Sequence, residues 1–534
     1  MQIERIYPGC TERPAAEVIG AKAANLARMA ALGLPVPPAF VLPVDLCAGI
    51  IAGDRQARQE LAAGLTAGIE FLEKTTGKRF GDRRQPLLVS VRSGAARSMP
   101  GMLDTVLNVG CTPAAVRGLI RVTGRPRFAF DCRRRFLEYF GSIVLGVDPA
   151  IFRARREEMM TAEAAASERE LDSEALERLA LTYQHAIEDE NHAFADTAME
   201  QLHAAVLAVF GSWMSNRAIT YRRLQHLDDL RGTAVTVQAM VFGNSEHSSG
   251  AGVAFSRDPS TGDDGPVIEV MFGSQGEDIV SGRYTPETEA AVVRRLPAVA
   301  AQLRQALARL EQEFRDVQDV EFTIEDGKLW ILQTRPAKRS PLAALRFAID
   351  FVKQGRISPE EALRRLKGIE PDMLVSKRLV DVGAQIGNGT GASAGIAVGR
   401  AAFDAAGATR LADSGDPVIL LRPHISTADV GGFAVSAGIV TAVGGRTAHA
   451  ALVARQMDKP CIVGCAELAI DAGARCARLP RATVAEGDWL SMDGGTGMIF
   501  LGRGKIIAQR LERELAEVER WRGNTSTGTL AVPA

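Results

Sequence analysis

The stretch 444–455 constrains this chain more than any other, because it joins a glycine loop to a histidine at the start of a helix. An apolar run at 438–443 has the composition of a buried strand and leads directly into two glycines. Alanine, leucine and valine dominate the residues that follow and predict a helix beginning near Thr447. His449 is therefore expected in the first turn of a helix.

A histidine in this position can carry a phosphoryl group. The free backbone N–H groups of a helix N-terminus, together with the positive end of the helix dipole, favour an anion there. An imidazole can attack phosphorus and hold the phosphoryl group covalently as a phosphohistidine. The alternative is that His449 only caps the helix.

The motif around His449 extends well beyond the histidine. The pattern G-G-x-T-x-H-A-A-x-x-A-R, continued by K-P-C-I-V-G-C at 459–465, resembles the phosphohistidine domain of the phosphoenolpyruvate-utilising enzymes, and within them the pyruvate, phosphate dikinases. The resemblance implies that His449 is the catalytic carrier of the phosphoryl group. It also implies that Thr447 is a regulatory phosphorylation site, with a helix N-cap hydroxyl as the alternative. Arg446 stands where the family has methionine, and this extra cation could hold a phosphoryl group or alter the partner that docks.

The composition excludes several classes of partner. A chain of 534 residues predicts about three to four domains. Its 63 Lys and Arg against 64 Asp and Glu give a net charge of -1, which argues against nucleic acid and anionic membranes as partners. No apolar run reaches the ~18 residues of a membrane span, and the N-terminus lacks the pattern of a signal peptide. Seven scattered cysteines suggest reduced thiols, so we expect a cytoplasmic protein.

Residues 1–110 contain the first set of groups suited to bind phosphates. A helix predicted at 20–32 begins near Lys22, and an apolar strand at 86–91 leads to Arg92 and then to a glycine-containing loop. A guanidinium binds polyphosphates in bidentate fashion. Both segments resemble the ATP-binding domain of the dikinases, which implies that Lys22 and Arg92 are catalytic and bind nucleotide phosphates, with Gly101 in a loop over them. A solvated surface lysine is the alternative for Lys22.

Residues 111–230 predict several amphipathic helices and no reaction chemistry. The histidines of this region are not spaced as a metal triad, so surface or packing roles are expected.

Residues 231–337 predict strands at 233–242, 250–258 and 267–270 and a hairpin formed by 318–324 and 329–335. Successive side chains of a strand point to opposite faces. Asp319 and Glu321 therefore share one face of the first hairpin strand, and Gln333 and Arg335 share one face of the second. Magnesium prefers one or two carboxylates with phosphate oxygens and waters. The pattern therefore suits a Mg²⁺ and triphosphate site, and an exposed polar face with incidental ion pairs is the alternative.

The hairpin sequence from Asp319 to Arg335 resembles the end of the ATP-grasp fold in the same superfamily. This resemblance implies that Glu321 and Gln333 are metal ligands and that Arg335 is catalytic. The nucleotide-binding set it implies, beyond Lys22, Arg92 and Gly101, consists of Gln238, Met240, Val241, Glu269, Asp319, Gln333 and Arg335.

The remaining chain predicts a hinge and a carrier. Helices are expected at 341–353 and 359–366, followed by a less regular stretch to about 390, and a carrier domain that serves two sites needs such a hinge. Short strands, among them 417–421 and 490–493, predict a compact domain, with a turn at 494–497. A charged helix at 505–522 and a flexible tail from 523 are expected to close the chain. The helix is a candidate for subunit docking.

The predicted fold class is α/β (α+β): an ATP-grasp domain with a helical insertion, plus a swivelling phosphohistidine α/β domain. The expected parts are 1–110 and 231–337 (ATP-grasp), 111–230 (helical insertion), 338–390 (helical linker), 391–504 (carrier) and 505–534 (helix and tail). The dikinases continue into a (β/α)₈ barrel that binds pyruvate and phosphoenolpyruvate. That barrel needs ~200 or more residues and is not expected here.

The expected reaction converts ATP and phosphate to AMP and pyrophosphate with the β-phosphoryl group on His449, and water in place of phosphate is the alternative. Three acceptor hypotheses remain open: pyruvate on a separate barrel subunit, another small molecule such as a phenol on a partner protein, or no small-molecule acceptor, as in a regulatory phosphocarrier. A homodimer is also compatible with this organisation.

Overall fold

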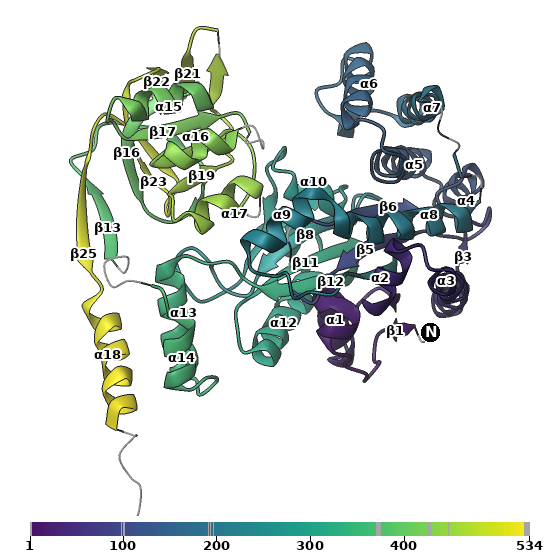
Figure 1. The fold of residues 1–534 in the computed structure, drawn as a ribbon. Helices are drawn as coiled ribbons and strands as arrows, with labels where there is room; N and C mark the ends of the chain where they lie inside the picture. Colours follow the sequence, from purple (N-terminus) through teal and green to yellow (C-terminus); the bar gives the residue numbers. More distant parts are fainter. Residues whose placement is uncertain are drawn as a thin grey trace, which may run out of the picture. The chain divides into compact units, whose positions relative to one another are not determined.

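The computed structural model describes residues 3–97, 99, 102–190, 192, 194–195, 197–369, 375–424, 429–446, 448–471 and 473–527. They form two compact units. The first comprises Met1–Ser245 with Trp330–Gln333, and the second comprises Glu246–Leu329 with Thr334–Ala534. Figure 1 shows the course of the chain, and each unit is described by itself.

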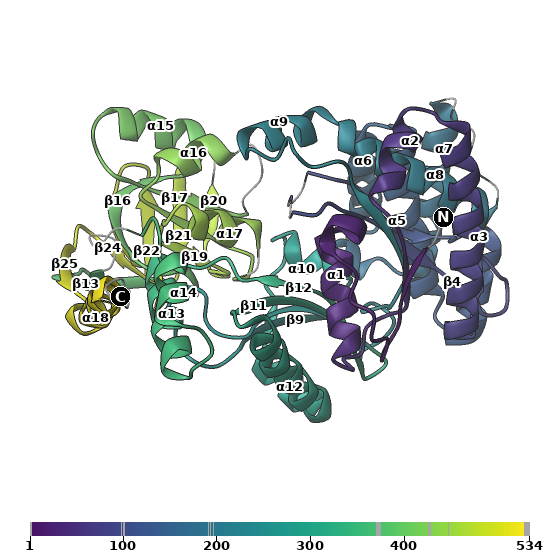
Figure 2. The same ribbon diagram turned by 60° about the horizontal axis from the view of Figure 1, so that its bottom comes forward.

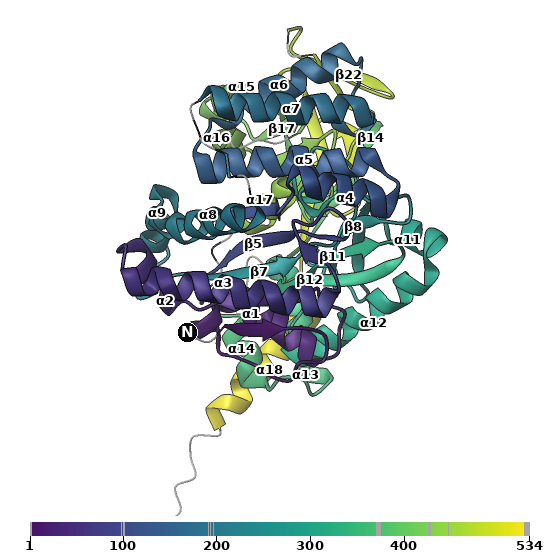
Figure 3. The same cartoon turned by 90° about the vertical axis from the view of Figure 1, so that its right-hand side faces the viewer.

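A five-stranded antiparallel sheet organises the first unit, in the order β1-β2-β7-β5-β6. Its strands are β1 (Glu4–Ile6), β2 (Ala39–Leu42), β5 (Val89–Gly94), β6 (Thr105–Val109) and β7 (Ala234–Ala239). Helix α1 (Ala16–Ala31) packs on β5 and β7, and α8 (Ala198–Gly211) packs on β5, β6 and β7, so that the sheet lies between the two helices (Figure 3). Helices α2 (Asp45–Ile51) and α3 (Arg55–Thr76) follow β2. Every residue of β2 and β7 is buried as a result.

The helical middle of the first unit forms as the sequence predicts. Its helices are α4 (Pro113–Thr123), α5 (Pro126–Tyr139), α6 (Pro149–Ala162), α7 (Ser173–Asp189), α8 and α9 (Asn216–Leu224). Proline opens α4, α5 and α6, where the missing N–H costs nothing. Side chains of Thr112, Asp148, Asp172, Thr197 and Ser215 cap five of the helices. Local sequence therefore fixes where these helices begin.

A second antiparallel sheet, β10-β9-β8-β11-β12, opens the second unit. Its strands are β8 (Gly250–Phe255), β9 (Val267–Phe272), β10 (Glu287–Thr288), β11 (Gln318–Glu325) and β12 (Lys328–Pro336), and the middle of β12 is grouped with the first unit. Helices α10 (Gly276–Val280), α11 (Glu289–Arg295) and α12 (Pro297–Phe314) lie between β9 and β11 in the chain. The predicted hairpin is confirmed: Asp326 and Gly327, both with positive φ (49° and 75°), form its tight turn.

An eight-stranded sheet, β14-β24-β23-β16-β17-β18-β19-β15, forms the core of residues 385–501, and β16 to β19 are parallel. Its strands are β14 (Gln385–Asn388), β15 (Thr390–Ser393), β16 (Ile396–Ala402), β17 (Val418–Arg422), β18 (Gly438–Thr441), β19 (Cys461–Val463), β23 (Trp489–Asp493) and β24 (Met498–Leu501).

Side chains alternate between the two faces of this sheet. Ile439 packs with α16 (Val430–Val435) and α17 (His449–Gln456), whereas Val440 packs with β21 (Cys476–Leu479) and β22 (Ala482–Ala485). Helix α15 (Ala405–Asp413) packs beside α16 (Figure 2). The predicted strands at 417–421 and 490–493 and the turn at 494–497 are confirmed.

The predicted linker helices form as α13 (Pro341–Lys353) and α14 (Pro359–Arg365). The stretch after them is more regular than predicted, because it contains β13 (Val375–Val380) as well as β14.

The prediction for the end of the chain is wrong in two places. Residues 505–510 form a strand, β25 (Lys505–Arg510), that pairs antiparallel with β13, and the helix α18 (Glu512–Thr527) begins only afterwards. The adjacent β-branched pair Ile506 and Ile507 favours this strand over a helix. The helix also continues to Thr527, through residues predicted as a tail.

The apolar side of α18 is covered within the chain. Leu515, Val518 and Trp521 are spaced three apart and pack with Leu345 and Ala362 of α13 and α14. This packing holds α18 against α13 and α14, and the role of the helix in subunit docking stays a prediction. Within the described ranges, no helix is both long and apolar enough to cross a membrane.

Candidate functional site

The first unit places Lys22 over the end of β5 through a close contact between two glycines. Gly20 interrupts α1 with φ 78° and ψ 153°. A Cβ at Gly20 would lie 2.0 Å from the Gly94 carbonyl oxygen, and the Ala21 N–H donates to the Ala95 carbonyl at 2.9 Å. Only glycine fits at position 20, because it has both a left-handed φ and no room for a side chain. The span α1 therefore consists of two helical segments separated at Gly20, and the segment that follows Gly20 and ends at Ala31 is the helix that the sequence predicts at 20–32.

Lys22 and Arg92 lie near each other in this arrangement. A Cβ built on Gly94 would lie 3.8 Å from the Lys22 Cβ, and Arg92 is two residues before Gly94 on the same strand. Lys22 is exposed and Arg92 is half-buried. Two cations at one strand end can hold a polyphosphate.

Three of the predicted nucleotide-binding residues, Gln238, Met240 and Val241, lie on or directly after β7 of this sheet. Gln238 lies on β7 opposite Ser90 and Ala39, is buried, and donates from Nε2 to the Pro37 carbonyl at 3.1 Å. Met240 and Val241 follow β7 and are half-buried. The amide of Gln238 thus has a structural partner in the protein. The predicted residues Gly101 and Thr447 lie outside the described residues.

In the second unit, the hairpin brings a buried carboxylate to an arginine. Arg335 donates from Nε to Asp319 Oδ2 at 2.8 Å. Asp319 is 3% exposed, and its Oδ1 accepts no hydrogen bond from the part of the chain that the structure describes. Burial raises the pKa of Asp319, although the positive charge of Arg335 opposes this effect. Burial alone would lower the pKa of Arg335, but the negative charges of Asp319 and Glu321 outweigh it, so the pKa of Arg335 is raised. This site has one cation bound to a carboxylate that still has acceptor capacity.

The donor set of the hairpin fits a magnesium ion. Glu321 is half-buried and lies two residues after Asp319 on β11, so the two carboxylates share one face of the strand. Gln333 lies on β12, two residues before Arg335, in the part grouped with the first unit. No cluster of three or more His, Cys, Asp or Glu suited to a metal occurs among the residues described. Magnesium does not need one, because phosphate oxygens and waters complete its shell.

His449 is the first residue of α17, after β18 and a loop with Gly444 at φ 114°. The predicted order of strand, glycine loop and helix is confirmed. The first turn of α17 therefore directs unpaired backbone N–H groups and the positive end of the helix dipole toward the loop.

The loop before His449 lies against the second sheet. The Arg446 N–H donates to Glu269 Oε1 at 2.6 Å, and its guanidinium binds Asp258 Oδ2 at 2.8 Å. A Cβ at Gly445 would lie 2.7 and 2.8 Å from the carboxylate oxygens of Glu269. Glu269, predicted as a nucleotide-binding residue, here accepts a hydrogen bond from the carrier loop, and glycine at 445 leaves it room.

Two residues that contact Arg446, Asp258 and Arg455, were not predicted as site residues. Asp258 follows β8 without any local signal of its role. Arg455 closes the motif that begins at Gly444, so the motif did contain a signal for it. Its guanidinium is 3% exposed and donates to the carbonyls of Ala392 and Arg446, both at 2.8 Å. Arg455 thus ties the loop to its own helix.

Comparisons with known proteins agree with one another. The family model described as the pyruvate phosphate dikinase AMP/ATP-binding domain matches residues 54–300 and 296–350, and the model described as the PEP-utilising enzyme mobile domain matches residues 415–497.

Among curated proteins, the chain is 41% identical over 493 residues to pyruvate, phosphate dikinase of Clostridium symbiosum, covering 91% of this chain and 56% of that protein. It is 40% identical over 526 residues to pyruvate, phosphate dikinase of Rhizobium meliloti, covering 94% of this chain and 58% of that protein. It is 38% identical over 510 residues to pyruvate, phosphate dikinase 2 of Zea mays, covering 95% of this chain and 58% of that protein. The chain thus spans somewhat more than half the length of these relatives.

Proposed function

The chain belongs to the pyruvate, phosphate dikinase family, and from this premise we propose that it transfers the β-phosphoryl group of ATP to His449. The observation that carries the proposal is the position of the His449 loop. Its Arg446 N–H is bonded to Glu269 on the sheet whose hairpin holds Asp319, Glu321 and Arg335.

The proposed reaction has two bond changes. His449 attacks the β-phosphorus, the bond to the α-phosphate oxygen breaks, and AMP leaves. Inorganic phosphate then attacks the γ-phosphorus, the bond from the γ-phosphorus to the β,γ-bridging oxygen breaks, pyrophosphate leaves, and the β-phosphoryl group stays on His449. Water in place of phosphate would release phosphate instead of pyrophosphate.

The chain's own side chains hold the charge in this proposal. Lys22 and Arg92 bind phosphate oxygens from the first unit, and Arg335, oriented by Asp319, does so from the second. Gly101 contributes the loop over the phosphates, and Gln238, Met240 and Val241 contact the adenine. Glu321 and Gln333 would hold a Mg²⁺ ion, which neutralises phosphate charge when bound. Thr447 is proposed as a regulatory site.

The test is protein labelling with ATP carrying ³²P at either the β or the γ position, with and without inorganic phosphate. With phosphate present, the protein should retain the β label and lose the γ label as pyrophosphate, with one AMP released per transfer. Retention of the γ label alone, with ADP as product, would contradict the proposal.

We propose pyruvate as the acceptor, bound on a separate subunit. The names of the relatives support pyruvate as the acceptor. The labelled protein should then form phosphoenolpyruvate from pyruvate only when a barrel subunit is added. Transfer to pyruvate without it would contradict the separate subunit, and no transfer to any small molecule would favour a cytoplasmic phosphocarrier.

A further inference from the structure

The turn that follows β8 is held in shape by its own sequence. The residues D-P-S-T-G at 258–262 favour a turn, and Gly262 at its end has φ 79°. The Asp258 Oδ1 atom accepts hydrogen bonds from the N–H groups of Ser260 and Thr261, at 2.8 and 3.1 Å. We call residues 258–262 the β8 turn. Its geometry fixes the direction of the Asp258 carboxylate.

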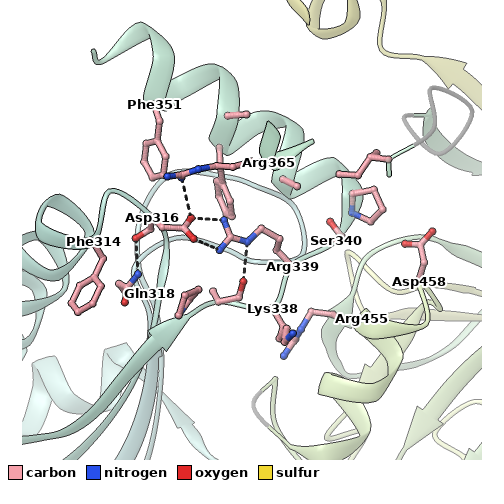
Figure 4. A pocket seen from close by; sticks show the side chains of 17 residues that line it. Phe314, Asp316, Gln318, Lys338, Arg339, Ser340, Phe351, Arg365, Arg455 and Asp458 are labelled. Atoms are coloured by element: carbon pink, nitrogen blue, oxygen red, sulfur yellow. Dashed lines mark hydrogen bonds and ion pairs between the residues drawn. The ribbon is translucent and has the colours of Figure 1, made fainter. Parts of the chain in front are cut away.

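Helix α13 holds one side of the β8 turn. Ser340, the N-cap of this helix, donates from its N–H to the Pro259 carbonyl at 2.9 Å and from its hydroxyl to the Ser260 carbonyl at 2.6 Å. Arg346 on the same helix donates to the Thr261 carbonyl at 2.8 Å. Figure 4 shows Ser340 in the segment that leads into the helix. Three successive carbonyls of the turn are therefore fixed from this side.

The other side of the β8 turn contacts the proposed carrier domain at two points. Asp258 accepts a hydrogen bond from Arg446 Nη1 at 2.8 Å on Oδ2, the oxygen that does not bind the turn. The Ser260 hydroxyl donates to the Ala392 carbonyl at 3.0 Å. Within the carrier domain, the Arg455 guanidinium holds the carbonyls of both Arg446 and Ala392. Two points that are tied together on one side thus meet two points that are tied together on the other.

The contact between Asp258 and Arg446 is a half-buried ion pair. The Asp258 side chain is 15% exposed, and the Arg446 side chain is 27% exposed. Glu269 adds a second carboxylate, which accepts a hydrogen bond from the Arg446 N–H at 2.6 Å. Hydrogen bonds that involve a charged group are stronger than those between neutral groups. The loop that leads to His449 therefore meets an acidic surface, and the guanidinium of Arg446 supplies a cation that matches it.

Glycines let this loop come close enough for the ion pair. A Cβ built on Gly445 would lie 2.4 Å from Pro286 Cγ, and one built on Gly464 would lie 3.1 Å from Thr285 Cγ2. A side chain at either position would push the loop away from the segment that precedes β10. The ion pair thus belongs to a direct contact between two surfaces and not to attraction over a distance.

We propose that Asp258 and Arg446 are positioning residues, whose ion pair docks the loop before His449 on the β8 turn. Phe255, three residues before Asp258, lies opposite Asp319 in the pairing of β8 with β11. Docking on the turn therefore brings the loop toward the hairpin that holds Asp319. The effect on phosphoryl transfer rests on the proposed function, whereas the docking contact does not.

Docking is measured without nucleotide, by hydrogen–deuterium exchange of the peptide that contains residues 444–448. The Arg446 N–H in this peptide is bonded to Glu269 across the contact, so its protection reports docking. Arg446→Met removes the charge, Arg446→Lys keeps it, and Asp258→Asn removes the opposite charge but retains an oxygen that accepts from the turn. The matched control is Arg410→Glu, which breaks an ion pair with Glu486 inside the carrier domain.

Arg446→Met and Asp258→Asn should each speed exchange of this peptide about tenfold. The double variant should exchange no faster than the faster single variant, because both changes remove the same ion pair. Arg446→Lys and Arg410→Glu should stay near wild type, and the β17 and β18 amides should stay protected in every variant, which distinguishes undocking from unfolding. The docking contact is overturned if the two single effects add, if neither variant changes the exchange, or if Arg446→Lys exchanges as fast as Arg446→Met.

A second readout is ³²P labelling by β-labelled ATP. Arg446→Met should take up label several-fold more slowly at saturating ATP with an unchanged KM for ATP, because the loop is displaced and the nucleotide is not. An unchanged rate, or a raised KM alone, would overturn the positioning role. Because exchange is measured without turnover, a wild type that takes up no label would contradict the proposed function and leave the docking result intact.

Discussion

The two antiparallel sheets present opposite charges and position them by different means. The first sheet provides the cation Arg92 on β5, and the helix α1 that packs on this sheet provides the cation Lys22. The second provides the carboxylates Glu269, Asp319 and Glu321, with Arg335 as their adjacent cation. A nucleotide with magnesium needs both kinds of group, because phosphate oxygens pair with cations and the metal pairs with carboxylates.

In the first sheet, backbone geometry positions the charge. Lys22 lies where it does because Gly20 and Gly94 allow α1 to approach the end of β5. In the second sheet, burial and ion pairing position it, since Asp319 is buried and held by Arg335. We therefore expect the first sheet to be sensitive to glycine substitution, and the second to be sensitive to changes of charge and pH.

The largest expected effect concerns the two cations, Arg92 and Lys22. Arg92→Ala should slow the labelling of the protein by β-labelled ATP by about 10²–10³-fold, because a preorganised charge is lost near the transferring phosphoryl group. Lys22→Ala should act similarly, and Lys74→Ala, an exposed lysine on α3, serves as the control. A fall of less than about tenfold in both variants, measured as the initial rate of label incorporation, would contradict a phosphate-binding role for this strand end.

The carboxylate side is tested with Glu321→Gln. Loss of this proposed magnesium ligand should raise the magnesium concentration needed for half-maximal labelling by about 10–100-fold, with recovery of the rate at high magnesium. Glu325→Gln on the same strand is the control. If Glu321→Gln lowered the labelling rate equally at every magnesium concentration, a magnesium-binding role for the carboxylates of the second sheet would be contradicted.

Glycine substitution tests how the first sheet positions its charge. Gly20→Ala forces a Cβ to within 2.0 Å of the Gly94 carbonyl oxygen at φ 78°, whereas a Cβ at Gly33, φ 70°, meets nothing within 4 Å. We expect Gly20→Ala to lower local stability by about 2 kcal/mol or more, and Gly33→Ala by only about 1 kcal/mol. Hydrogen exchange of the β5 amides measures the difference. Equal protection in the two variants would mean that the glycine contact does not position α1.

The smallest expected effect concerns pH and Asp319. A carboxyl group with a raised pKa binds protons more readily in the folded than in the unfolded protein, so wild type should lose stability as pH rises from about 4 toward the folded pKa. Asp319→Asn lacks the titrating carboxyl group, so its stability should stay constant across the pH window in which wild type loses stability. Urea unfolding between pH 4 and 7 measures the two pH dependences. The explanation from burial fails if wild type and variant show the same pH dependence.

Local patterns account for what the sequence predicts well. The strand, glycine loop and helix around His449, and the hairpin around Gly327, follow from glycine positions and from hydrophobic periods of 2 and 3.6 over a few residues. Prolines 113, 126, 149, 297, 341 and 359 mark helix starts.

Pairing between distant segments accounts for what was missed. The strand β25 forms by pairing with β13, which lies far away in the chain. The local sequence around Lys505 does not reveal this pairing, so a helix was predicted there. The contact of Arg446 with Asp258 and Glu269 joins residues that no short pattern connects. A family motif predicts a role for His449, but it does not predict the groups against which its loop packs.

The most direct test of the account asks whether His449 carries the phosphoryl group. Wild type, His449→Ala and His424→Ala are incubated with β-labelled ATP, magnesium and phosphate. His424 is an exposed histidine that follows Pro423, whose carbonyl accepts a hydrogen bond from the Val443 N–H. We predict acid-labile, base-stable label on wild type and His424→Ala, recovered in the peptide that contains residues 447–455, and none on His449→Ala. Label of equal amount and stability on all three proteins would contradict the account.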